Sequence, residues 1–398
     1  AGSLRLLIIG VIAIAVFAIG VLPSFPPTPP PPWRSEIALA GIVAGLAGLA
    51  FLLTWRHVAR LRAGGAVRRA ESLSSRIPIV APTRRRAFAS PAAAHFWLEW
   101  RSSGIVLPAL VGGVLCLVIM PISWLVRRDA AFTSYLLLVA LASPVILAVP
   151  VGIAFCKPAF WSEDLAVPPF VAIRPLSSQD LVAIKVSVAA VSAVLSWVVV
   201  TAFLAVWLSS RANLDSVSVL AIQLWAFHGH SVAAVYGIGV LVVLAGLFLT
   251  WRFLVSRLWS GLSGMRPMFV GSVVSLVVLL IAGLVFDAGR LPGWLLADPA
   301  RLAPAAWISA AAVVAKYWIA AYAWHGVSPR YLRVYLLIWL AGTASVLGLG
   351  LVVWGIVRIY LPLDVARARS VVVLLALIAM PLARVGLAPF WLARNRHQ

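Results

Sequence analysis

The sequence predicts an all-α membrane protein, a polytopic bundle of about ten membrane-spanning helices. Three observations carry this prediction. Of the 398 residues, 63% are hydrophobic and only 11% are charged, and the mean hydropathy is +1.05. A soluble domain carries roughly 25% charged residues. This chain therefore has too few charged side chains to cover a surface in water, and lipid must surround most of the molecule.

Ten apolar stretches are long enough to cross a bilayer, which takes about 20 residues. They cover residues 4–22, 36–54, 105–126, 132–155, 183–208, 231–250, 267–286, 304–325, 335–357 and 368–390. Most have tryptophan near their ends, which is typical of helices that meet the headgroup level of a membrane. The first stretch is longer than a signal-peptide core and lacks a cleavage site, so we interpret it as a span.

The distribution of arginine predicts the orientation. Segment 55–104 is rich in arginine, and placing it in the cytoplasm puts most of the 32 Lys and Arg residues on that side. Both termini are then cytoplasmic. The basic residues occur in short clusters between apolar runs, so the net charge of +21 indicates orientation in a membrane and argues against a nucleic-acid partner.

The predicted spans divide the chain into three parts. Residues 1–54 hold two spans joined by an external, proline-rich loop at 23–32, which cannot form a helix. Residues 55–104 form a basic cytoplasmic linker that ends in an amphipathic helix. Residues 105–398 hold the remaining eight spans. Because the sequence begins without methionine, we expect it to be an N-terminally truncated form of a longer chain.

The amphipathic helix is predicted from residues 90–104, SPAAAHFWLEWRSSG, with Ser90 as its N-cap and Pro91 as its first residue. A helical projection separates two faces, one with Ala93, Phe96, Trp97 and Trp100 and the other with His95, Glu99 and Ser102. We expect this helix to lie in the membrane surface, because continuing it into the next span would bring Glu99 and Arg101 toward lipid. A simple extension of that span is the alternative.

Segment 157–185, KPAFWSEDLAVPPFVAIRPLSSQDLVAIK, is the most informative part of the sequence. Pro168 and Pro169 interrupt any helix, and Ser177 with Asp180 forms a capping box that starts the next one. We expect a short helix near 161–166, an extended turn and then the new helix. Such a structured element at the cytoplasmic face can transmit force to a soluble partner. An ordinary connecting loop is the alternative.

An amphipathic helix followed by two spans and the pattern E-x(n)-F-x-x-x-R-P-L-S-x-x-x-L-x-x-x-K resembles the permease subunit of ABC-2 type exporters. The resemblance covers roughly residues 90–397, includes FWLEWR near its start, and is closest to larger bacterial permeases. It implies a bacterial inner-membrane protein that pairs with another permease chain as a homodimer or heterodimer. Spans one and two have no counterpart in a minimal six-span permease.

The resemblance also implies roles for individual residues. Segment 157–185 would hold the coupling helix that docks on a separate ATPase subunit, and the preceding amphipathic helix would be the elbow helix. The residues implied in coupling are Glu163, Asp164, Phe170, Arg174, Pro175, Ser177 and Lys185. Those implied in the elbow are Phe96, Trp97, Glu99, Trp100 and Arg101.

The chain itself lacks the residues for nucleotide hydrolysis. A P-loop needs Gly-Lys followed by Ser or Thr, but Lys157, Lys185 and Lys316 follow cysteine, isoleucine and alanine. We therefore expect no enzymatic activity and no cofactor in this chain, with ATP and Mg²⁺ held by the partner subunit. Cys116 and Cys156 lack metal-ligand spacing, so no metal site is expected.

The substrate is left open by the sequence. A mostly apolar bundle fits a hydrophobic or lipid-like substrate. Lys316 lies within the apolar stretch 304–325, and either its stem extends toward the cytoplasmic end or it lines a polar route between helices. An ATP-independent secondary transporter is the main alternative function. Ion coupling usually uses carboxylates inside the membrane, and no acidic residue lies near the middle of an apparent span. An intramembrane enzyme is a third, weaker alternative.

Overall fold

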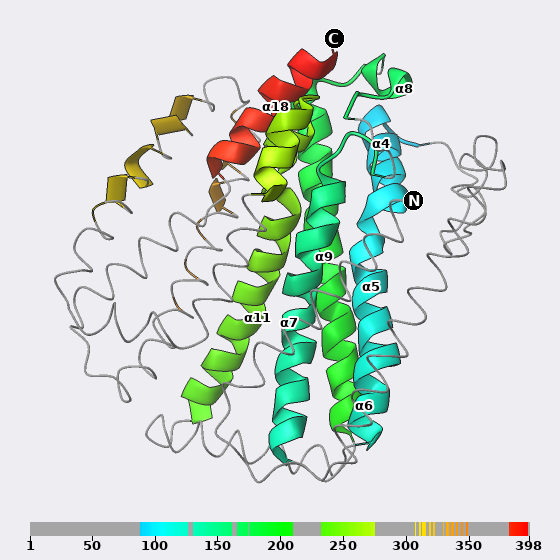
Figure 1. The fold of residues 1–398 in the computed structure, drawn as a ribbon, viewed down its shortest axis with the longest axis vertical. Helices are drawn as coiled ribbons and strands as arrows, with labels where there is room; N and C mark the ends of the chain where they lie inside the picture. Colours follow the sequence, from blue (N-terminus) through cyan, green and yellow to red (C-terminus); the bar gives the residue numbers. More distant parts are fainter. Residues whose placement is uncertain are drawn as a thin grey trace.

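The computed structural model describes residues 88–125, 130–160, 165–173, 175–209, 232–274 and 382–396, together with isolated positions between 307 and 348. This part of the chain is all-helical. Its long helices stand side by side along the length of the molecule, with shorter helices gathered at one end (Figure 1). Predicted spans one and two, and most of spans seven to ten, lie outside the described residues.

Four helices in the described part are long and apolar enough to cross a membrane. They cover Pro91–Trp124, Thr133–Phe155, Ser178–Leu208 and Gly239–Gly261, and they correspond to predicted spans three to six. Their outward surface is apolar: Leu117 is 76% exposed and Val206 is 64% exposed. Continuous exposed apolar surface of this kind is what a lipid environment accommodates.

The first of these helices is built from five segments. They are α4 (Pro91–Glu99), the π-helical turn η2 (Trp100–Gly104), α5 (Val106–Val114), a second π-helical turn η3 (Leu115–Ile119) and α6 (Met120–Leu125). Ser90 caps α4 as predicted, since its Oγ accepts a hydrogen bond from the Ala93 N–H at 3.2 Å. The helix then continues directly into the span. A separate helix in the membrane surface is therefore not confirmed, and the described residues show the predicted alternative, an extension of the span.

Both π-helical turns have a physical cause in the sequence. A proline inside a helix removes one N–H and its ring collides with the carbonyl four residues earlier. Pro108 and Pro121 stand four residues after Gly104 and Leu117, which lie in η2 and η3. Widening the helix by one residue at those positions relieves the collision. The Glu99 carbonyl, directly before η2, also accepts hydrogen bonds from the hydroxyls of Ser102 and Ser103.

The other long helices are α7 (Ala130–Phe155), α9 (Ser178–Leu208) and α11 (Val232–Val255). The short helices are α8 (Pro169–Ala172) and α12 (Leu258–Gly261), and the last described helix is α18 (Leu382–Arg396). Helix α9 contacts α4, α5, α7, α11 and α18, so it is the centre of the described bundle. The buried core, which includes Leu107, Val111, Leu147, Val188 and Leu254, lies among these helices.

Several helices begin or end at one end of the bundle. Helix α7 ends there, α9 begins there, and α4, α8 and α18 lie at the same end (Figure 1). We call it the loop end. Backbones come close together at this end, because a Cβ added at Gly152 of α7 would meet the Phe253 carbonyl oxygen of α11. Glycine is required where two helices approach so closely.

Candidate functional site

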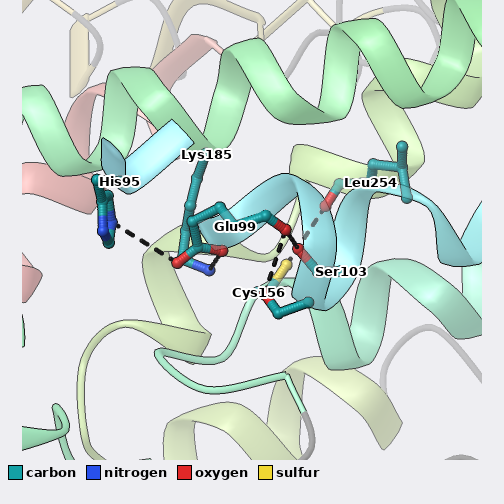
Figure 2. A network of polar contacts seen from close by, with 7 residues as sticks. His95, Glu99, Ser103, Cys156, Lys185 and Leu254 are labelled. Atoms are coloured by element: carbon teal, nitrogen blue, oxygen red, sulfur yellow. Dashed lines mark hydrogen bonds and ion pairs between the residues drawn. The ribbon is translucent and has the colours of Figure 1, made fainter. Parts of the chain in front are cut away.

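A buried ion pair joins α4 to α9 at the loop end (Figure 2). Lys185 Nζ lies 2.9 Å from Glu99 Oε2, and both side chains are more than nine-tenths buried. His95, one turn before Glu99, places its Nε2 3.7 Å from Glu99 Oε1 and is also buried. A buried charge is tolerated when it is paired and hydrogen-bonded. The two opposite charges therefore stabilise each other between helices that are far apart in sequence.

The position of Glu99 corrects one sequence inference. His95 and Glu99 were assigned to the face opposite Phe96 and Trp100, but they are buried, and Phe96 and Trp100 pack against the same core. Positions 92, 95, 96, 99, 100 and 103 form one broad helical stripe, and α4 contacts α9. Glu99 thus faces a partner cation instead of lipid, which removes the objection to a continuous helix.

The neighbours of Lys185 make this a closed site. Its Nζ lies 5.4 Å from the centre of the Phe155 ring, at the end of α7. Cys156, the residue after Phe155, donates a weak hydrogen bond from Sγ to the Leu254 carbonyl oxygen at 3.5 Å. Burial raises the pKa of the Cys156 thiol to about 12, although the positive charges of Arg257 and Lys185 oppose this rise. The thiol is therefore neutral and inert at physiological pH.

The loop between α7 and α9 is structured. Ser177 caps α9 as predicted: its Oγ accepts from the Asp180 N–H at 3.1 Å, and its own N–H donates to Asp180 Oδ2 at 3.3 Å. Before it, Pro168 and Pro169 lead into α8, where Pro169 is the first helical residue. The described part of the predicted helix at 161–166, Leu165 and Ala166, is not helical. That prediction is wrong at these positions, because proline suits the first turn of a helix and starts α8 instead.

Helix α8 presents apolar side chains at the surface. Phe170 is 50% exposed and Ile173, which follows the helix, is 83% exposed, whereas Val171 between them is buried. Val171 therefore anchors the turn to the core while its neighbours point away from it. Helix α18 also holds this loop, through hydrogen bonds from Asn395 and Arg396 to the backbone carbonyls of Leu165, Ala172 and Leu176.

The predicted site residues fall into three groups. The first group is Glu99 and Lys185, which form the buried ion pair. The resemblance implied separate roles for them, Glu99 in the elbow helix and Lys185 in coupling. Phe170, Pro175 and Ser177 lie exposed on the loop, and on the first helix Arg101 is exposed while Phe96, Trp97 and Trp100 are half-buried. Glu163, Asp164, Arg174 and Lys316 lie outside the described residues.

Three polar features escaped the sequence analysis. They are the contacts of His95 with Glu99, of Asn395 and Arg396 with the loop, and of Trp197 Nε1 with Thr250 Oγ1 at 3.1 Å. The sequence shows polar or aromatic residues within or beside apolar stretches, which indicates that they need polar partners. It does not indicate which residues those partners are.

The buried polar contacts of the described residues join helices to one another and to the loop. Within the described ranges, no group of three or more His, Cys, Asp or Glu side chains is placed to hold a metal ion. Comparison with protein-family models, with curated proteins and with solved structures finds no significant match for this chain.

Proposed function

We propose that this chain is the membrane-spanning permease subunit of an ATP-driven exporter of the ATP-binding cassette type. The loop end would face the cytoplasm, and the loop around α8 would dock on a separate ATPase subunit. The transported molecule would be hydrophobic or lipid-like, and two permease chains would form the path. ATP binding by the partner would move α8, and the attached helices would rearrange.

The observation that carries the proposal is the exposed apolar tip of a firmly held loop. Phe170 and Ile173 expose half or more of their surface beyond the long helices, next to the buried Val171. Exposed apolar side chains on an anchored segment are typical of an interaction site. The loop is also connected to the spans, because Ser177 and Asp180 cap α9 directly after it.

The buried ion pair supports the same proposal. A displacement of the start of α9 moves Lys185, and Lys185 is bonded to Glu99 on the first spanning helix. Two spanning helices are thus joined close to the loop. The secondary transporter alternative would favour an unneutralised carboxylate midway along the helices. Among the described residues the buried carboxylate is Glu99, which is paired with a lysine at the loop end.

The test is co-purification from native membranes in a mild detergent, with ATP hydrolysis as the readout. The tagged chain is expected to recover an ATPase polypeptide that contains a P-loop. Phe170→Asp and Ile173→Asp should each remove most of that activity while the chain remains folded. Ser209→Asp, which adds the same charge to an exposed position at the other end of α9, should keep it. Recovery of no ATPase with the unmodified chain would contradict the proposal.

A further inference from the structure

Helix α18 contacts two separate segments at the loop end through one side chain. The Asn395 amide Nδ2 donates to the Leu165 carbonyl oxygen at 2.9 Å and to the Leu262 carbonyl oxygen at 3.1 Å. Leu165 precedes α8, whereas Leu262 follows α12. Asn395 is only 7% exposed, so both hydrogen bonds are protected from water. One buried amide thus connects the loop between α7 and α9 to the turn after α12.

The turn after α12 is shaped around this amide. Gly264 has a φ of 73°, a left-handed conformation that glycine adopts without steric cost. A Cβ at this position would lie 2.6 Å from Asn395 Oδ1. The turn therefore needs glycine for both its backbone conformation and the close approach of Asn395.

Arg396 holds the loop at two further points. Its Nη1 donates to the Leu176 carbonyl oxygen at 2.8 Å, and its Nη2 donates to the Ala172 carbonyl oxygen at 2.7 Å. Ala172 ends α8 and Leu176 precedes the cap of α9, so helical hydrogen bonding leaves both carbonyls available. Hydrogen bonds from a charged guanidinium are stronger than those between neutral groups. Arg396 therefore fixes α8 relative to the start of α9.

We propose that α18 is a brace that makes loop residues 165–173 and 175–176 move as one unit with segment 258–264. Asn395 and Arg396 are its positioning residues. A displacement of α8 then reaches α9 through Arg396 and the end of α11 through Asn395. The brace itself is a property of this chain. The idea that an ATPase subunit displaces α8 rests on the proposed function.

Hydrogen exchange of the full chain in lipid nanodiscs tests the brace. Asn395→Asp keeps the size of the side chain but loses both donated hydrogen bonds, and should raise exchange about tenfold in peptides covering 165–176 and 258–264. Arg396→Gln should raise exchange in 165–176 alone. Arg394→Gln is the matched control, because Arg394 lies on the same helix and is exposed, and it should change neither peptide.

Two results would overturn the brace. One is unchanged exchange in both peptides of Asn395→Asp, and the other is an equal rise throughout the core of α9, which would report general destabilisation. In the complex with its ATPase, ATP is expected to alter exchange in 258–264 of the unmodified chain and to lose that effect in Asn395→Asp, while the ATPase stays bound. If no ATPase binds the unmodified chain, the proposed function fails, and the exchange pattern without ATP still decides whether α18 is a brace.

Discussion

Lys185 on α9 and Glu99 on α4 are separated by 86 positions in the sequence, yet their charged groups lie 2.9 Å apart in a buried setting. The contact joins the first long apolar helix of the described bundle to α9, which begins directly after the loop. Removing one partner from such a pair leaves a buried charge without compensation, which costs more than replacing both.

A double-mutant cycle follows from this contact. Glu99→Leu and Lys185→Met should each lower the free energy of unfolding by about 3–5 kcal/mol, and the double variant should recover most of that loss. The measurement is equilibrium unfolding in detergent micelles. Arg101→Ala, at an exposed position beside Glu99, is the control and should change stability by less than about 0.5 kcal/mol. Single-variant losses that simply add in the double variant would show that the pair does not interact.

The starts of α4 and α9 and the length of α9 could be predicted from the sequence, because they depend on residues close to one another along the chain. The cap at Ser90, the capping box of Ser177 and Asp180, and the apolar length of the helix Ser178–Leu208 each depend on residues close in sequence. A cap depends on hydrogen bonds between residues three positions apart, and a span depends on the number of consecutive apolar residues that a bilayer requires.

The long-range contacts were not predictable from one sequence. A helical projection shows which side chains share a face of α4, but it does not show that Lys185 lies opposite Glu99. Asn395 and Arg396 stand in the sequence LARNR, which suggests a solvated, basic end of a helix. Their carbonyl partners Leu165 and Leu176 lie 230 and 220 residues away and are backbone groups, which carry no residue-type signal.

Close backbone packing between α7 and α11 gives a second prediction. Gly152→Ala should lower the thermal unfolding temperature by several degrees, because its Cβ would meet the Phe253 carbonyl oxygen, a backbone atom with no freedom to rotate away. Gly239→Ala on α11 is the matched control, since nothing lies within 4 Å of its added Cβ. Equal unfolding temperatures for the two variants would show that the helices are not packed as described.

Thiol labelling gives a third prediction. In a Cys116→Ser chain, Cys156 is the remaining cysteine, and it should react slowly with N-ethylmaleimide until the protein is unfolded. Burial raises its pKa to about 12, so the reactive thiolate is a trace species at both pH 8 and pH 9. The slow labelling rate should rise about tenfold between these two pH values, because the thiolate fraction grows tenfold per pH unit far below the pKa. An ordinary exposed thiol accelerates about threefold over that range. A rate that follows the ordinary thiol would contradict the closed packing around Cys156.

The start of α9 gives a fourth prediction. Ser177→Ala removes the oxygen that accepts the Asp180 N–H, so it should destabilise the first turn by about 1 kcal/mol and raise hydrogen exchange there. Ser178→Ala, one residue later and inside the helix, is the control and should leave that exchange unchanged. If both variants exchange alike, the cap does not define the start of α9.

Photo-crosslinking from the tip of the loop tests the proposed function most directly. Benzoylphenylalanine in place of Ile173, which is 83% exposed, would be activated in intact cells and its products identified by mass spectrometry. The same group in place of Leu117, exposed on the apolar outer surface, serves as the control and should react with lipid. We expect position 173 to crosslink to a polypeptide that carries a P-loop. A crosslink from position 173 to lipid alone, with no such polypeptide, would contradict docking of an ATPase at α8.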